Sequence, residues 1–243
     1  MFARGHCQGL EQRAAEIQSG KTDLDDDIDE GHEMTEHKTM NTIIHAAIRR
    51  DLKRFDAALG AFPAGSRRRA DQLKAAWDHF AYQLHRHHED EEQFFWPALR
   101  ELGASDSIVG DLHGEHAVML RALESGNTAM ADLGGDPSAD NAEAARTVVS
   151  GIDGIIEDHL VHEERDLEPF TAGHLGAPQL KAAAASARKS HSEGGGVFFS
   201  WLSDGIDAEA ARAMRHEVPA PVLFMLTRLG RRSYQRRIGS AWS

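Results

Sequence analysis

Two short stretches of the chain repeat one arrangement of residues that can bind a metal ion. The first, "HHEDEEQFFWP", covers residues 87–97, and the second, "HLVHEERDLEP", covers residues 159–169. Each places a Glu four residues after its first His, a second Glu beside it, and a Pro at its end. Residues four apart lie on the same face of an α-helix. The repeat therefore predicts two His–carboxylate pairs: His87 with Glu91, and His159 with Glu163.

Both pairs are expected to lie within the apolar stripe of their helix. In the first stretch, Leu84 lies three residues before the His and Phe95 four residues after the Glu. In the second, Ile155 lies four residues before the His and Leu167 four residues after the Glu. A carboxylate inside such a stripe is costly unless it is paired or bound to a cation. We therefore expect the two pairs to face each other across a core and to hold cations.

Two further histidines, His45 and His116, belong to apolar stripes elsewhere in the chain. His45 lies three residues before Ile48, and His116 lies four residues after Leu112. Four imidazoles and two carboxylates suit two divalent ions, each bound by two His and bridged by both Glu. Carboxylate and His ligands on facing helices build di-iron sites in bundles. Nitrogen and oxygen ligands without thiolate suit iron, manganese or zinc. The predicted metal ligands are His45, His87, Glu91, His116, His159 and Glu163.

The elements that must position these residues read as four long amphipathic helices. Apolar residues recur at three- and four-residue steps over about 40–59, 70–96, 107–133 and 141–168. Segments rich in Gly and Pro, "GAFPAGS" and "LGGDPSAD", separate two of these patterns. Long helices joined by short connections favour an all-α, up-down-up-down antiparallel four-helix bundle.

The segments on either side of the bundle differ from it in composition. Residues 1–36 include the acidic run "DLDDDIDE" and are expected to form a disordered arm. The bundle is expected to span 37–172, and residues 173–243 to form a helical extension packed on it. That extension ends in an arginine-rich stretch, expected to be a solvated face or to pair with the acidic body. The alternative for this stretch is a docking surface for an acidic partner or a membrane.

Charge and cysteine content restrict the classes of function. The net charge of −12 makes nucleic acid an unsuitable partner for the body of the protein. The single Cys, Cys7, excludes an internal disulfide bond and agrees with a reducing compartment. Neither a signal peptide nor an apolar stretch of membrane-spanning length is evident. We therefore expect a cytoplasmic protein.

The order His, HxxxE, His, HxxxE over four helices resembles the hemerythrin-like, or HHE cation-binding, family. The resemblance covers about 37–172 and rests on "IIHAAIRRDLKRF", "HHEDEEQFFWPAL", "EHAVMLRAL" and "HLVHEERDLEPF". It implies an antiparallel four-helix bundle with an oxo- or hydroxo-bridged di-iron centre that meets O2 or related small molecules. The C-terminal "VPAPVLFMLTRLGRRSYQRR" is similar to extensions on some bacterial members.

The sequence departs from the oxygen-carrying hemerythrins in two places. Their third helix carries HxxxH, whereas Leu112 stands four residues before His116 here. Their fourth helix carries HxxxxD, a step that reaches Glu164 here, and we select Glu163 because it repeats the spacing of the first motif. An alternative fifth nitrogen ligand is His113. The residues that flank the ligands, expected to support them or to face solvent, are His88, His162, Glu92 and Glu164.

Three hypotheses for function follow. The first is a non-haem di-iron protein that binds or senses O2 or nitric oxide. The second is a catalase- or peroxidase-like di-iron enzyme, because fewer nitrogen ligands leave more open positions on the metal. The third is a structural metal-binding module whose C-terminal extension binds a protein partner.

The bridging role of the two carboxylates can be tested directly. We predict that Glu91→Ala and Glu163→Ala each lose at least one metal ion, because two dications would then face each other with less screening. Glu92→Ala and Glu164→Ala should keep both ions, since one residue turns a helix by roughly 100°. Metal analysis of the four purified variants checks this. The opposite pattern would mean that the assumed register of both motifs is wrong.

Overall fold

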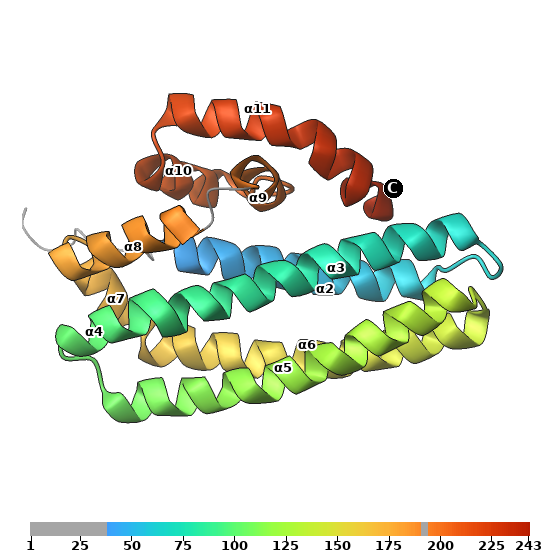
Figure 1. Ribbon diagram of the computed structural model, residues 1–243, viewed down its shortest axis with the longest axis horizontal. Helices are drawn as coiled ribbons and strands as arrows, with labels where there is room; N and C mark the ends of the chain where they lie inside the picture. The colour runs from blue at the N-terminus through green and yellow to red at the C-terminus, as the bar shows by residue number, and fades with distance from the viewer. Residues whose placement is uncertain (1–37, 191–193) are drawn as a thin grey trace, which may run out of the picture. The chain divides into compact units, whose positions relative to one another are not determined.

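Four long helices form the body of the protein in the computed structural model, which describes residues 38–190 and 194–243 (Figure 1). Each helix packs against two neighbours, in the ring order α2, α3, α5 and α6. Within the described ranges no strand occurs, so the predicted all-α bundle is confirmed. The predicted N-terminal arm, 1–36, lies outside the described residues. The bundle helices are α2 (Met40–Gly60), α3 (Arg67–Asp90), α5 (Asp106–Gly135) and α6 (Ala139–Asp166).

Each bundle helix begins at a Ser or Thr whose side chain caps it. The hydroxyl oxygen accepts a hydrogen bond from the backbone N–H three residues later, which satisfies one of the unpaired donors of the first turn. Such caps make each helix begin at a defined residue and so help to set the register of the helices against one another. The capping residues are Thr39, Ser66, Ser105 and Ser138.

The bundle core contains most of the predicted apolar stripes. Trp77 on α3 is fully buried, and its ring packs so close to Gly126 on α5 that a Cβ there would lie 2.1 Å from the ring. The Trp77 indole N–H donates a 2.8 Å hydrogen bond to Asn127. On α6 the predicted Ile152 and Ile156 are buried together with Val149, while Val148 and Ile155, which the periodicity also places in the stripe, are only half-buried.

A single π-helical turn, η1 (Glu91–Phe95), interrupts the second helical pattern before it continues as α4 (Trp96–Glu101). This turn moves the buried position from the predicted Phe95, which is half-buried, to Trp96, which is 3% exposed. The reason is that a π turn inserts one extra residue into the helical repeat. Pro97 lies in the first turn of α4, where its missing N–H is tolerated.

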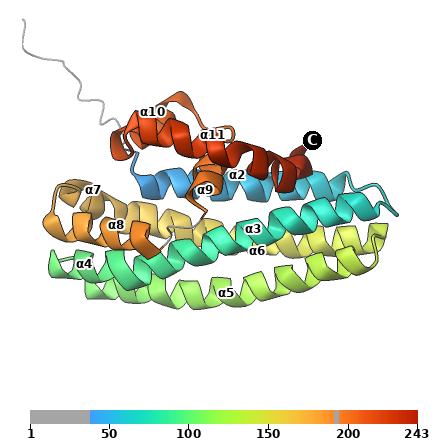
Figure 2. The ribbon, with the colours of Figure 1, turned by 45° about the horizontal axis from the view of Figure 1, so that its top comes forward.

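Further helices follow the bundle and pack on it. α8 lies against η1 and α4, as Figure 2 also shows, while α9, α10 and α11 pack along α2 and α3. Within the described residues the chain after the bundle is helical, as expected for an extension. The bounds are α7 (Glu168–His174), α8 (Pro178–Ser190), α9 (Gly195–Leu202), α10 (Ala208–Glu217), α11 (Ala220–Arg237) and the 3₁₀ turn η2 (Gly239–Trp242).

Buried polar contacts attach α9 and α11 to the bundle. The Trp201 indole N–H donates a 2.7 Å hydrogen bond to Asp51, which is 1% exposed. The Tyr234 hydroxyl donates to Asp204 at 2.7 Å, and Arg54 of α2 donates to the same carboxylate at 2.7 Å, so Asp204 joins α11 to the bundle. His79 of α3 meets both aromatic rings edge-on, with centroid distances of 5.9 Å to Trp201 and 6.3 Å to Tyr234. Burial, with the charges of nearby arginines, lowers the pKa of His79 to about 4.

The depressed pKa of His79 predicts a loss of stability in mild acid. In the unfolded chain His79 binds a proton below its ordinary pKa of about 6.5, whereas in the folded chain it does so only below about pH 4. The free energy of unfolding therefore falls as the pH drops from about 6.5 to about 4. Between about pH 7 and pH 5 this single group should cost about 2 kcal/mol of unfolding free energy. In urea unfolding between pH 7 and pH 5, the His79→Phe variant should lose about 2 kcal/mol less unfolding free energy than the parent protein. An unchanged pH slope would show that His79 is not buried as described.

Candidate metal centre

The six predicted ligands converge at one place in the bundle core. Every bundle helix contributes: His45 from α2, His87 from α3, His116 from α5, and His159 with Glu163 from α6. Glu91, at the start of η1, completes the set. None of the six is more than 7% exposed. The structure therefore brings together all the residues whose spacing had singled them out.

The donor atoms form two groups, each with its ligand atoms within 4.8 Å of one another. Glu91 belongs to both, because its Oε1 lies 3.2 Å from His87 Nε2 and its Oε2 lies 3.4 Å from His116 Nε2. Glu163 Oε2 lies 3.2 Å from His45 Nε2 and 3.9 Å from His159 Nε2. The first group is His45, His87, Glu91 and Glu163, and the second is His88, Glu91, His116 and His159.

His88 is a donor that the spacing argument did not select. It directly follows His87, and one residue turns a helix by roughly 100°, so the two cannot share a face. However, α3 lies between α2 and α5, and it can serve both sides at once. His87 reaches His45 of α2, with 3.1 Å between their Nε2 atoms, and His88 stacks on His116 of α5 at 3.9 Å. A sequence signal for His88 exists in principle: it is the pair of adjacent histidines on a helix that has a partner helix on each side.

Carboxylates on the outer side hold three of the imidazoles in place. The Nδ1–H of His45 donates to Glu164, that of His116 to Glu92, and that of His159 to Glu115, each at 2.8 Å. With the proton on Nδ1, the neutral imidazoles of His116 and His159 present the Nε2 lone pair to the centre, as a metal ligand must. Although burial opposes it, hydrogen bonding to Glu163 and Glu164 raises the pKa of His45 to about 9, so this imidazole must release a proton before its Nε2 can bind a metal. Glu92 and Glu164 were predicted to flank the ligands, and no spacing signal pointed to Glu115.

Most of the inner donor atoms have no hydrogen-bond partner within the described protein, although the Nε2 atoms of His45 and His87 meet each other. Six side-chain atoms in the two groups are shielded from solvent and accept or donate no hydrogen bond, although buried polar atoms are nearly always satisfied. Their convergence is the pattern expected where a cation completes the bonding, so the donor set fits two divalent ions. These atoms are both carboxylate oxygens of Glu91, Glu163 Oε2, and the Nε2 atoms of His88, His116 and His159.

The electrostatics of the cluster also favour cations. Burial lowers the pKa of His87 and His88 well below the ordinary value and that of His116 to about 4, which leaves these imidazoles neutral. Burial, together with the charge of Glu163, raises the pKa of Glu91. Two carboxylates this close cannot both ionise cheaply without positive charge between them.

The family comparison agrees with this geometry. The model of the Hemerythrin HHE cation binding domain matches residues 42–171, more than half of the chain. The protein belongs to the hemerythrin HHE cation-binding family. No curated protein and no solved structure matches the chain.

His88 changes how this hemerythrin-like bundle compares with the oxygen carriers. The third helix lacks the second histidine of their HxxxH pattern, because Leu112 stands there and is fully buried in apolar surroundings. With His88 on the preceding helix, five imidazoles surround the centre. His113, the alternative fifth ligand, is 66% exposed and contacts Glu92 instead of either donor group.

A third buried carboxylate lies beside the donors. Asn41 donates through Nδ2 to Glu163 Oε1 at 3.1 Å and to Glu168 at 3.2 Å. The Thr39 hydroxyl donates to the other oxygen of Glu168 at 2.5 Å. Asn41 thus ties one oxygen of Glu163 and leaves Oε2 facing the centre. Burial raises the pKa of Glu168, whose side chain sequence patterns did not select.

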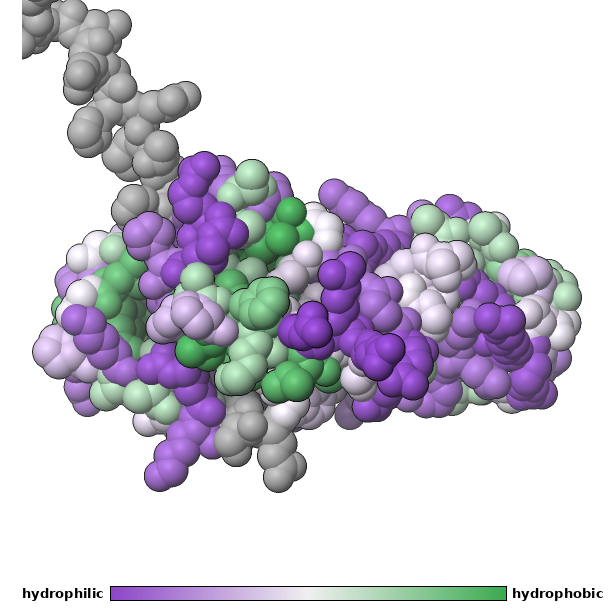
Figure 3. Space-filling model, turned by 90° about the horizontal axis from the view of Figure 1, so that it is seen from above, coloured by the Kyte–Doolittle hydropathy of each residue, from purple (hydrophilic) through white to green (hydrophobic). Residues whose placement is uncertain are grey.

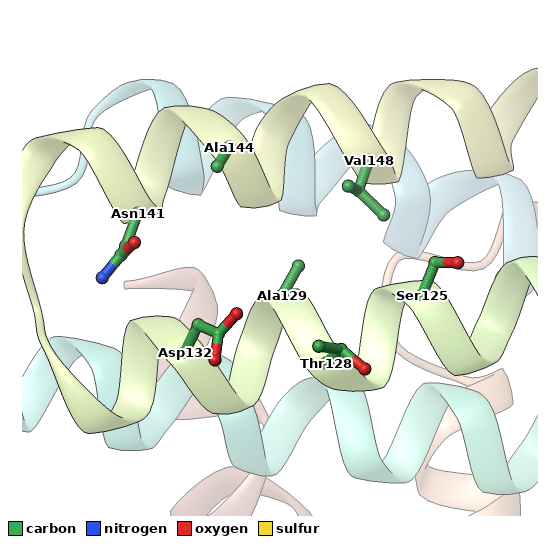
Figure 4. A pocket seen from close by; sticks show the side chains of 7 residues that line it. All are labelled: Ser125, Thr128, Ala129, Asp132, Asn141, Ala144 and Val148. Carbon is green, nitrogen blue, oxygen red and sulfur yellow. The ribbon is translucent and has the colours of Figure 1, made fainter.

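Trp96 and a surface hollow complete the surroundings. Trp96, placed by the π turn, stacks on His116 with a centroid distance of 4.6 Å and covers that ligand. The hollow in Figure 4 lies between α5 and α6, from Ser125 to Val148, at least two helical turns from His116 and His159. It contains none of the metal-ligand candidates.

Across the described residues, no helix combines the length and apolar character that a membrane span needs.

The seven-donor arrangement predicts that His88 is needed for full metal loading. His88→Ala should lose the ion of the group formed with His116 and His159, because that group keeps only two imidazoles and a shared carboxylate. His113→Ala, an equal truncation on the exposed side of α5, should keep the parent metal content. Metal analysis after extensive dialysis distinguishes the two variants. Equal loss in both, or in neither, would exclude His88 as a ligand.

Proposed function

We propose that the protein is a non-haem di-iron protein that binds or reacts with O2, peroxide or nitric oxide at the bundle centre. One observation supports this above all. Two four-donor groups share Glu91, and six of their inner atoms form no hydrogen bond among the described residues. A shared carboxylate is how two ions are held close enough to act on one small molecule. The proposed ligands are the six predicted residues together with His88.

The donor set supports iron with room for a ligand. Imidazole and carboxylate donors without thiolate suit iron, with zinc and manganese as alternatives. Seven side chains do not fill the coordination shells of two octahedral ions even when both carboxylates bridge. Bound iron would supply reversible ligand binding or redox chemistry. The chain orients the imidazoles through Glu92, Glu115 and Glu164, and excludes bulk water by burying every donor.

Metal analysis with a visible spectrum tests the proposal. Protein purified under iron supply should hold about two irons per chain, as bundle di-iron sites do. It should show a charge-transfer absorption that changes reversibly with O2 or nitric oxide. A protein that holds no iron, or holds zinc with a fold that melts on its removal, would instead support the structural module.

Peroxide decomposition is a second candidate, favoured by Glu168. Splitting two peroxide molecules into water and O2 moves protons between oxygen atoms, and a buried carboxylate beside the centre can carry them. With His88 counted, five imidazoles leave fewer open positions on the bound ions than four would, which favours an enzyme less. Glu168 is 8% exposed and is linked to Glu163 only through Asn41.

Glu168→Gln separates the two candidates. The amide keeps the acceptor for Thr39 but cannot deliver a proton. For an enzyme, O2 release from peroxide should fall by about 10²-fold or more at unchanged iron content, in the range of a lost general acid or base. Asp158→Asn, an exposed carboxylate on α6, serves as the control. Peroxide turnover no faster than that of free iron in the parent would reject the enzyme and leave the gas-binding proposal intact.

A further inference from the structure

The outer face of α11 has an unusual combination of side chains. The inner face of the helix, Leu223, Gly230 and Tyr234, is buried. Gly230 crosses α9 at Gly196 so closely that a Cβ on Gly230 would lie 1.9 Å from the Gly196 carbonyl oxygen. Because only glycine fits at that crossing, the rotation of α11 about its axis is fixed. The exposed side chains of α11 are therefore held toward solvent.

Large apolar side chains protrude from the first half of that outer face. Of the nine exposed large hydrophobic residues in the described chain, four lie on this one helix. Single exposed apolar residues are ordinary, but a group on one helix marks an interaction surface. The four are Val222, Phe224, Met225 and Leu229, with exposed fractions of 42%, 67%, 53% and 72%.

The second half of the same face is basic. α11 carries five arginines and no acidic residue, although the chain as a whole has a net charge of −12. Figure 3, which views the molecule from this side, shows hydrophobic residues gathered toward one end and hydrophilic residues beyond them. The exposed arginines nearest the apolar group are Arg228, Arg231, Arg232 and Arg236.

We propose that the outer face of α11 binds the surface of a lipid bilayer that carries anionic headgroups. Protruding Phe and Leu side chains suit insertion at the headgroup boundary, and adjacent arginines suit the phosphate layer. The acidic body orients the molecule, because repulsion keeps it away from the bilayer while the arginine face approaches. A second copy fits less well, since α11 has no carboxylate to meet the arginines of another α11. Nucleic acid would leave the apolar half uncovered.

Vesicle sedimentation with the full-length protein tests this proposal. Vesicles of phosphatidylcholine with phosphatidylglycerol should bind the protein, and vesicles of phosphatidylcholine alone should bind it much less. Added salt should weaken binding, because the Debye length shortens from about 10 Å at 0.1 M to about 3 Å at 1 M. Arg231→Gln/Arg232→Gln should lower the partition coefficient at least about tenfold, given the usual contribution of each basic residue near an anionic surface.

Matched variants separate this face from the rest of the surface. Phe224→Ser/Leu229→Ser should abolish sedimentation, whereas Tyr82→Ser/Leu120→Ser, which removes large side chains 54% and 49% exposed on α3 and α5, should not. Circular dichroism and metal content should match the parent in both. Absence of binding to anionic vesicles, or equal binding by both double variants, would overturn the proposal. So would light scattering that shows a dimer dissociated by the α11 variant, which would assign the face to self-association.

Discussion

Two carboxylates buried in the centre of a helical bundle are the constraint on which the rest of the structure depends. Glu91 and Glu163 are 4% and 3% exposed, and among the described residues their ion pairs are with histidines instead of arginine or lysine. An uncompensated buried charge costs far more than one packing contact contributes. The surrounding imidazoles reduce that cost only in part, and divalent cations would remove it. The arrangement of the helices is therefore the one expected of a protein that binds metal ions in its core.

A local change in backbone geometry, the π turn, positions side chains around that centre. The π turn at Glu91–Phe95 begins three residues after His88 of α3 and changes the helical register beyond it. As a result, Trp96 turns inward to stack on His116, and the chain can continue past Pro97 without breaking. π turns are frequent at functional sites because they re-aim side chains without ending a helix. Here the turn begins at the residue shared by both donor groups.

The C-terminal helices add a second layer with a different physical character. They are attached to α2 and α3 by buried polar contacts around Asp51 and Tyr234 as well as by apolar packing. Such contacts specify one arrangement, because each buried polar group must find its partner. The close Gly196–Gly230 crossing then determines which side of α11 faces outward. The metal centre and the outer face of α11 are thus separate features of one compact unit, residues 38–243.

The sequence alone determined the bundle helices, most of their apolar stripes and six of the seven side chains that meet at the centre. Helical periodicity is a local property of the sequence. A His and a Glu four residues apart on an apolar stripe are therefore predicted to share the helix face that points into the core. Only the tertiary structure decided the contribution of His88, because it depends on α3 lying between two other helices. The same holds for Glu115, Asn41 and Glu168, whose partners lie on other helices with no fixed sequence spacing. The shift from Phe95 to Trp96 also escaped the sequence pattern, since a π turn leaves no periodic signal of its own.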